Sequence, residues 1–166
     1  NGADVTASPD DPAGWYTLNL FNNVIVNNVA GLAGAGISLQ DVAKANIINN
    51  TVANNDCTAT SALAFTAGQA NSTPQPSGIV GARHSDQLIA LFGAGVLQQY
   101  SNPLLVNNIV WQNRSWYNDA SLNGGQGGLV AMAGSYRDLA ILGSTTPADP
   151  HLAPKNSVLS SPWKMS

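Results

Sequence analysis

The chain has little charge, a single cysteine and no glutamate. Charged residues make up 9% of its 166 residues, against about 25% in an average soluble domain. One cysteine, Cys57, excludes an internal disulfide framework and a cysteine-rich metal site. The net charge of −3 leaves no basic stripe to neutralise phosphates, so we expect no nucleic-acid partner. The longest apolar run, 88–97, is shorter than the about 20 residues that a membrane-spanning helix needs, and we expect no membrane span.

Asparagine and glycine fill the place of the missing charges, with 19 and 16 residues. Because 44% of the residues are apolar, the chain is too hydrophobic to be disordered, and its length predicts one domain. The one acidic pair, Asp10-Asp11, is interpreted as a solvated turn rather than a calcium site. We expect neither a cofactor nor a metal ion.

Three nine-residue segments align without a gap, and each carries a pair of asparagines and a further asparagine at its end. Such internal repetition indicates a repeat architecture. The segments are Leu20-Phe-Asn-Asn-Val-Ile-Val-Asn-Asn28, Ile47-Ile-Asn-Asn-Thr-Val-Ala-Asn-Asn55 and Leu105-Val-Asn-Asn-Ile-Val-Trp-Gln-Asn113. The identical columns are Asn22, Asn49 and Asn107; Asn23, Asn50 and Asn108; and Asn28, Asn55 and Asn113.

A glycine-rich element precedes the last two copies: Gly34-Ala-Gly-Ile37 and Gly93-Ala-Gly-Val96. Short β-branched runs bounded by Gly and Asn are strand signals, so each unit predicts three short strands in fewer than thirty residues. That matches one turn of a parallel β-solenoid. Apolar side chains would stack inward from turn to turn, and the asparagines would accept the left-handed corner conformation and form a structural amide ladder. The alternative is a β-sandwich with unrelated Asn-rich turns.

The pattern Asn-Asn-x-Val/Ile-x-x-Asn, preceded by Gly-Ile-Ser-Leu, resembles the right-handed parallel β-helix repeat of the pectate-lyase-like superfamily. The resemblance covers 17–56 and 93–113, and 125–143 loosely. It implies an all-β fold, a right-handed parallel β-helix of three to four turns, and a chain that is a fragment of a larger member. It does not fix a function, since the superfamily includes lyases, hydrolases, esterases, epimerases, adhesins and structural surface proteins.

The rest of the chain is divided by composition. We expect a polar leader at 1–14, the β-helix at 15–143 with a long excursion at about 57–92, and an extended, proline-rich tail at 144–166. Within the excursion, 67–77 reads as a loop and 85–92 as a short helix with Ser85 as N-cap. Alternatively, Ser77-Gly-Ile-Val80 is itself a strand and competes with Gly95-Val96 for the place before the last Asn segment. Segments 129–131 and 139–142 predict the strands of one more turn.

No catalytic residue is predicted. The run Arg83-His84-Ser85-Asp86 carries groups suited to nucleophilic catalysis, but four adjacent residues seldom converge on one point. The enzymes of the resembling superfamily need clustered acids, and here Asp41 and Asp56 are isolated. One set of aromatic and basic side chains could form a ligand or partner surface, or simply pack against the barrel: Tyr100, Trp111, Arg114, Trp116 and Tyr117.

Two function classes follow. The first is a noncatalytic structural or adhesive module of a secreted or cell-surface assembly, located outside the cell. In it, an open end of the β-helix packs against another polypeptide, either the rest of its own precursor or a different subunit. The second is a fragment of a carbohydrate-active enzyme, similar to a polysaccharide lyase, that acts on extracellular polysaccharide.

Overall fold

The computed structural model describes residues 2–94, 96, 99–144 and 150–160. Its helical segments are short: α1 (Gly2–Ala7), α2 (Asp86–Ile89), α3 (Leu122–Gly125) and the 3-10 turns η1 (Pro12–Gly14) and η2 (Ala62–Ala64). The strands are β1 (Leu18–Phe21), β2 (Val24–Val26), β3 (Val29–Ala30), β4 (Ile37–Leu39), β5 (Ala45–Ile48), β6 (Thr51–Ala53), β7 (Asp56–Cys57), β8 (Ile79–Ala82), β9 (Leu104–Val106), β10 (Ile109–Trp111), β11 (Arg114–Asp119), β12 (Gly128–Tyr136), β13 (Leu139–Leu142) and β14 (Val158–Leu159). Of the helices described, none is long and apolar enough to span a membrane.

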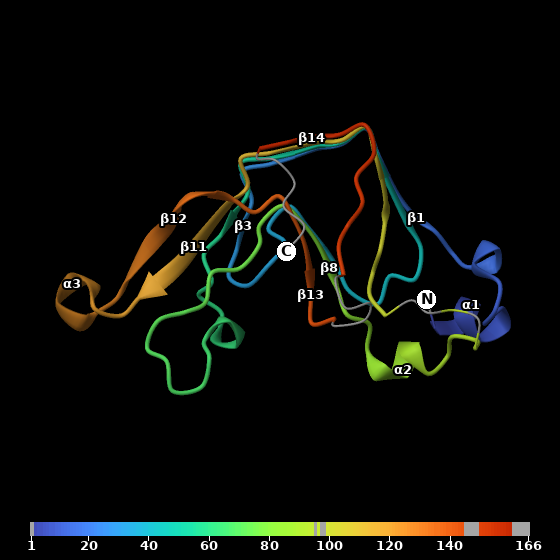
Figure 1. Ribbon diagram of the computed structural model, residues 1–166, viewed down its shortest axis with the longest axis horizontal. Helices are drawn as coiled ribbons and strands as arrows, with labels where there is room; N and C mark the ends of the chain where they lie inside the picture. The colour runs from blue at the N-terminus through green and yellow to red at the C-terminus, as the bar shows by residue number, and fades with distance from the viewer. Residues whose placement is uncertain (1, 95, 97–98, 145–149, 161–166) are drawn as a thin grey trace.

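Consecutive strands lie in different sheets, and the chain returns to each sheet in the same order (Figure 1). The sheets are β1-β5-β9, β2-β6-β10-β14, β3-β7-β11 with β12 at its edge, and β4-β8-β13. We call one passage through the four sheets a turn. The first turn spans 18–39, the second 45–82 and the third 104–142, and 155–160 begins a fourth. The expectation of an all-β fold with parallel sheets is confirmed.

The turns stack in register because equivalent residues pair across them. Leu20 pairs with Ile47, and Ile47 with Leu105. In the next sheet, Val52 lies between Ile25 and Val110. Parallel pairing in register places each inward side chain directly over its counterpart in the next turn, about 4.8 Å away. The result is a continuous apolar column inside the turns.

The apolar core follows these columns. Its fully buried members come from the second and third turns, namely Ile47, Val52, Ile79, Leu105 and Val110, together with Leu152. Their first-turn counterparts Leu20 and Ile25 are only partly buried, because no strand of the described chain lies beyond them. Burial of such a side chain contributes about 1.5–3 kcal/mol, so most of the stability resides in the middle turns.

The corners of the turns use left-handed backbone. Asparagine tolerates positive φ because its amide hydrogen-bonds locally, and the corner residues repeat from turn to turn. Before β2, β6, β10 and β14 they are Asn22, Asn49, Asn107 and Asn156, with φ of 57°, 58°, 54° and 49°. After β2, β6 and β10 they are Asn27, Asn54 and Gln112, with φ of 58°, 54° and 52°.

The interval 57–92 differs from its prediction, because it contains a strand of the stacked turns. Strand β8 pairs with β4 on one side and β13 on the other. The strand alternative for Ser77-Gly-Ile-Val80 is therefore correct, and the favoured reading of one continuous insertion is corrected. The short helix after Ser85 is present, and the Ser85 Oγ accepts a hydrogen bond from the Leu88 N–H. Val96 packs instead against a second apolar cluster, formed by Val5, Trp15, Ala43 and Leu88. It therefore does not take the place in the stacked turns that Ile37 has.

Two further expectations are corrected, one within the third turn and one after it. Strand β12 pairs antiparallel with β11 as a hairpin that projects from the stacked turns, and does not line them (Figure 1). The tail expected at 144–166 contains β14, which pairs with β10 and extends that sheet. Residues 145–149 and 161–166 of the expected tail lie outside the described residues.

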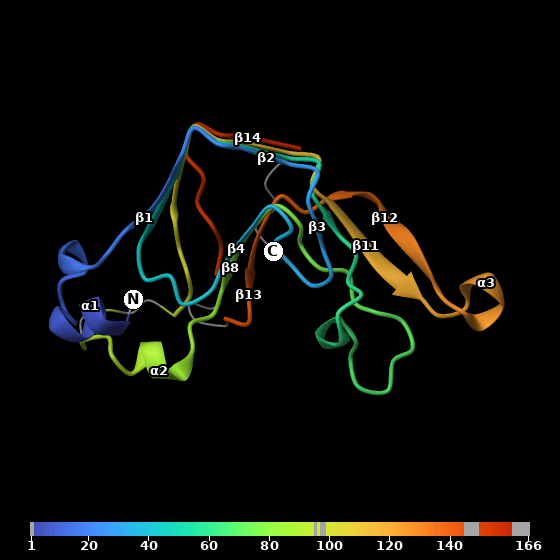
Figure 2. The same ribbon diagram turned by 180° about the vertical axis from the view of Figure 1, so that it is seen from behind.

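The polar leader expected at 1–14 is also corrected. It holds the helix α1, whose Val5 is fully buried, and the turn η1. Val5 and Trp15 pack with Ala43 and Leu88 in the second apolar cluster. This cluster lies beside the stacked turns, where α1 and α2 approach each other (Figure 2).

Candidate functional site

A ladder of asparagine amides runs along the corner before β2, β6, β10 and β14. Asn50 Oδ1 accepts from the backbone N–H and the Nδ2 of Asn23 at 2.9 and 3.0 Å. Asn108 Oδ1 accepts the same pair from Asn50 at 2.9 and 3.2 Å. The Nδ2 groups also donate to main-chain carbonyls of the preceding turn, as from Asn50 to Leu20 at 2.8 Å. Asn50 and Asn108 are buried, so these bonds satisfy amides that are shielded from water.

A second ladder follows the next corner. Asn55 Oδ1 accepts from the N–H and the Nδ2 of Asn28 at 3.1 and 2.9 Å. Asn113 Oδ1 accepts from Asn55 at 3.2 and 2.9 Å. The structure thus joins two of the three repeated asparagine columns into ladders, while the column of Asn22 supplies left-handed corners.

Beyond the third turn, other side chains accept the last hydrogen bonds of both ladders. The N–H of Asn108 donates to Ser157 Oγ at 3.0 Å. In the second ladder, the Nδ2 of Asn113 donates to Asp138 Oδ1 at 2.9 Å, and Asp138 Oδ2 accepts from the Ser160 N–H at 2.7 Å. A carboxylate only accepts, so Asp138 suits a place where the incoming groups are all donors.

The sequence interpretation missed these closing residues. Asn156-Ser157-Val158-Leu159 repeats the corner and the strand that follow Asn107, with serine in place of the second asparagine. This similarity could have identified Ser157 from the sequence. No sequence signal pointed to Asp138, because it follows the β12 hairpin and does not belong to a repeated segment.

The first turn presents an open edge. Strands β1, β2, β3 and β4 each end the order of their sheet in the described chain. The outer side chains are strongly exposed here, with Val24 at 73% and Val29 at 69%. Such rows of unpaired backbone groups template the addition of further strands. The early end of the stacked turns is therefore the prominent candidate interaction surface.

The aromatic and basic set of the sequence prediction is only partly brought together. Arg114 forms a bidentate ion pair with Asp56 at 2.7 and 2.5 Å, and its guanidinium lies 5.3 Å from the Trp116 ring centroid. Hydrogen bonding to Asp56 raises the pKa of Arg114. The pair is solvent-exposed on the Arg114 side, so its contribution to stability is small.

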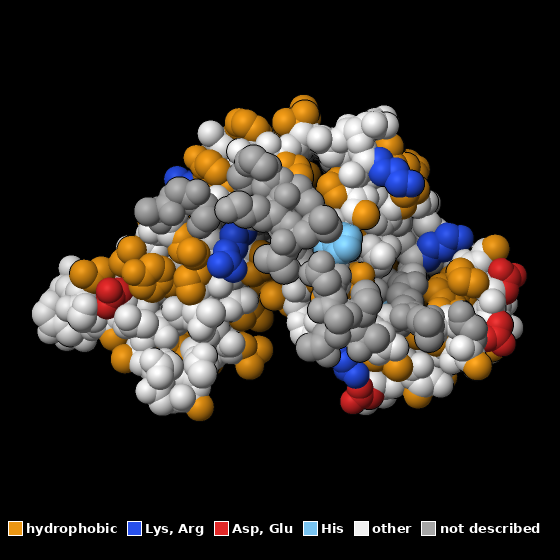
Figure 3. Space-filling view, in the orientation of Figure 1, with side chains coloured by type: hydrophobic (Ala, Val, Ile, Leu, Met, Phe, Trp, Pro, Cys, Tyr) orange, Lys and Arg blue, Asp and Glu red, His pale blue; other side chains and the backbone are white. Residues whose placement is uncertain are grey.

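The remaining members of the set are divided among three places. Trp111 belongs to the column of Val26 and Ala53, on the outer face of the β2-β6-β10-β14 sheet. Figure 3 shows apolar side chains along the rim over this sheet and few charged ones. Tyr117 pairs with Val130 inside the hairpin. Tyr100 is buried and bridges to Arg83.

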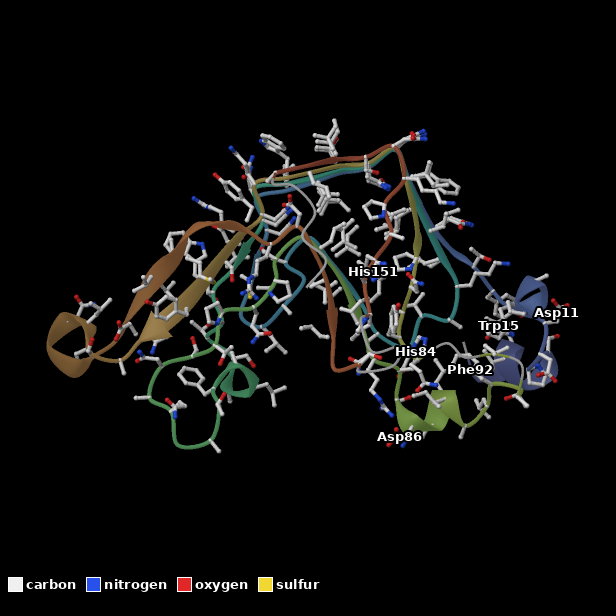
Figure 4. The ribbon with its side chains drawn as sticks, viewed as in Figure 1. Asp11, Trp15, His84, Asp86, Phe92 and His151 are labelled. Carbon is white, nitrogen blue, oxygen red and sulfur yellow. The ribbon has the colours of Figure 1, made fainter. Side chains whose placement is uncertain are left out.

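The segment from Arg83 to Asp86 does not assemble a catalytic arrangement. The side chain of His84 is fully buried, with its Nδ1 3.8 Å from Asp41 Oδ1. His84 packs edge-on against Phe92, which stacks on Trp15, and the three rings lie in a row beside the stacked turns (Figure 4). Burial lowers the pKa of His84, Asp41 opposes this effect, and Arg83 adds to it. Asp86 faces away and binds Arg83 at 2.7 Å.

Cys57 is buried in β7 and donates its Sγ hydrogen to the Leu32 carbonyl oxygen. Burial raises the pKa of this thiol, and a nucleophilic cysteine needs the opposite shift. Cys57 therefore packs as a small apolar side chain.

Over the residues that the structure describes, no three His, Cys, Asp or Glu side chains form a group that could hold a metal ion. The geometry thus offers two surfaces, the open first turn and the exposed outer face around Trp111. Comparison of the chain with protein-family models, with curated proteins and with solved structures gives no match.

Proposed function

We propose that the chain forms a right-handed parallel β-helix and serves as a noncatalytic structural or adhesive module of an extracellular or cell-surface assembly, in which the first turn packs against another polypeptide. The return of the chain to the same four sheets in a constant order supports the β-helix. The right hand is proposed because crossover connections between parallel strands in one sheet are right-handed in about 98% of cases.

The observation that carries the proposed role is the open first turn. Four sheets present their edge at the same end, and the core side chains Leu20 and Ile25 are only partly covered there. A stack of repeats needs a terminal cover for solubility, and α1 lies beside the turns rather than over them. A low surface charge does little to prevent association.

Size-exclusion chromatography with light scattering tests this role. Because open backbone edges pair promiscuously, the isolated chain should associate weakly at high concentration. Val24→Lys with Val29→Lys should abolish the association without lowering the melting temperature, since lysines on an edge block pairing. Leu63→Lys, at a side chain 82% exposed outside the edge, is the matched control. A chain that stays monomeric at all concentrations and also binds no peptide that copies one of its turns would overturn the proposal.

The second candidate, a polysaccharide-acting enzyme of the lyase type, has less support. It needs a basic side chain to take a proton, and two of the candidates, Arg114 and Arg83, are held by Asp56 and Asp86. Cleavage of an acidic polysaccharide in the presence of calcium would establish this activity.

A further inference from the structure

The two asparagine ladders have a direction. At every step between turns, the backbone N–H and the Nδ2 belong to the earlier turn and the accepting Oδ1 belongs to the later one. This holds from Asn23 to Asn50 and from Asn50 to Asn108. It holds equally from Asn28 to Asn55 and onward. Each ladder therefore has an acceptor end at the first turn and a donor end at the last.

The chain closes the donor end itself. Ser157 Oγ and the Asp138 carboxylate accept the final N–H groups of the two ladders. At the acceptor end, neither the Oδ1 of Asn23 nor that of Asn28 receives a hydrogen bond from any described residue. The two ends thus differ in chemistry, and only the first-turn end is left with unused ladder groups.

Backbone groups at the same corners run in the opposite direction and also leave the first turn with unused groups. In the later turns, the N–H after each asparagine corner donates to the preceding turn, as from Thr51 to the Asn23 carbonyl at 2.9 Å and from Asp56 to the Asn28 carbonyl at 2.8 Å. The equivalent residues of the first turn are Val24 and Val29, and no preceding strand of the described chain lies against them. The edge therefore offers, at each of two corners, one amide oxygen acceptor beside one backbone donor.

We infer that the first turn docks a separate polypeptide that adds an extended turn in the same direction, with asparagine amides at two corners that donate to Asn23 Oδ1 and Asn28 Oδ1. This inference rests on the proposed function and specifies the partner at the same surface. The added turn would also cover Leu20 and Ile25, the two core side chains that are partly exposed at this end.

A second copy of the chain satisfies this surface poorly. Two first turns placed face to face bring acceptor against acceptor, which leaves all four Oδ1 atoms without a donor. The last turn of a copy has already committed its ladder donors to Ser157 and Asp138. Since leaving a buried polar group without a partner is costly, self-association is weak, and a partner with free corner amides is preferred.

A peptide that copies the second turn tests the inference. The probe is Lys44–Thr58 with Cys57→Ser, because Asn50 and Asn55 are its corner donors. The matched control peptide carries Asn50→Asp and Asn55→Asp, which replaces both Nδ2 donors by carboxylate oxygens of the same shape. We expect the first peptide to bind the full chain at least tenfold more tightly, and to slow amide exchange at Val24 and Val29.

A second comparison assigns the difference to the ladder. In the full chain with Asn23→Ser and Asn28→Ser, which shortens both acceptor side chains, the tenfold preference should fall below twofold while thermal unfolding stays cooperative. Serine is chosen because Ser157 already occupies this ladder position. Equal binding of both peptides to the natural chain would overturn the ladder inference and leave the proposed function standing. No binding of either peptide, with a chain that stays monomeric, would overturn both.

Discussion

Single asparagines differ in importance according to their place in the ladders. Asn50 accepts two hydrogen bonds from Asn23 and donates from its Nδ2 to Leu20, Ile48 and Asn108. The Oδ1 of Asn23 accepts no hydrogen bond from any described residue, and Asn23 is solvent-exposed. In one turn, the asparagine of this column therefore belongs to a buried hydrogen-bond network. In another turn, the same residue type has an Oδ1 that receives no hydrogen bond from the described residues.

Asn50→Ala should lower the free energy of unfolding by roughly 1–3 kcal/mol, because it strands several buried donors and acceptors. Asn23→Ala is the matched control and should cost less than about 1 kcal/mol. Urea denaturation with linear extrapolation measures both. If the two variants unfold at the same midpoint, the ladder does not stabilise the turns in the way described.

The buried His84 predicts a pH dependence of stability. Burial lowers its pKa in the folded chain, so the unfolded chain binds more protons as the pH falls through the ordinary range near 6.5. Stability should therefore be complete above that range and decrease toward the lowered folded pKa. His84→Gln should flatten the melting temperature between pH 7 and 5. A His84→Gln variant with the same pH profile as the natural chain would contradict this prediction.

At the scale of elements, the strand after the glycines and the two strands of each Asn segment were predictable, as for β4, β5 and β6, because corner chemistry and inward apolar residues recur at constant offsets. The strands β3, β7 and β11, which begin after the last asparagine of each segment, were not predicted. Strand β8 has a weaker signal, since it shares with β4 only a Gly-Ile pair, Gly78-Ile79 against Gly36-Ile37.

The glycines of that pair have a packing cause. A Cβ on Gly36 would lie 2.5 Å from Val52 Cγ1, and one on Gly78 would lie 2.1 Å from the Asp138 carbonyl oxygen. Close approach of neighbouring turns excludes any larger residue here. Gly93-Ala-Gly-Val96 carries a similar sequence signal, but Val96 packs against the second apolar cluster. Local pattern could not separate the two cases.

Ile79→Ala tests whether β8 belongs to the stacked turns. Ile79 is fully buried in the main core, so its truncation should cost about 2–5 kcal/mol. Leu63→Ala changes a mostly exposed side chain in the same interval and should stay within about 0.5 kcal/mol. Chemical denaturation of both variants distinguishes a strand of the core from a dispensable loop. Similar small losses would contradict the assignment of β8.

Across the whole molecule, regular and irregular parts lie on opposite sides. Among the described residues, no element covers the outer face of the sheet β2-β6-β10-β14, whereas α1 with α2, the 58–76 loop and the β11-β12 hairpin form two lobes away from that face (Figure 1). The segments that lengthen the turns follow β3, β7 and β11. Others connect β4, β8 or β13 to the next turn. The candidate site was accordingly predictable where it is built from repeats, at the open end and its Asn corners. The Arg114–Asp56 pair and Asp138 were not, since they depend on where the irregular segments return.

The stacking of turns also predicts a gradient of local stability. In a quasi-one-dimensional stack, each turn is stabilised by its neighbours, and the first turn has a neighbour on one side only among the described residues. Amides of 18–30 should therefore exchange at least tenfold faster than those of 45–57, although the two segments share the same asparagine pattern. Native-state hydrogen exchange measured by mass spectrometry provides the comparison, with 104–115 as the second interior reference. The difference reflects local opening of the end turn, which exposes little apolar surface beyond what is already exposed. Uniform protection over all three segments would instead show that the turns open as one cooperative unit, with no weak end to receive a partner.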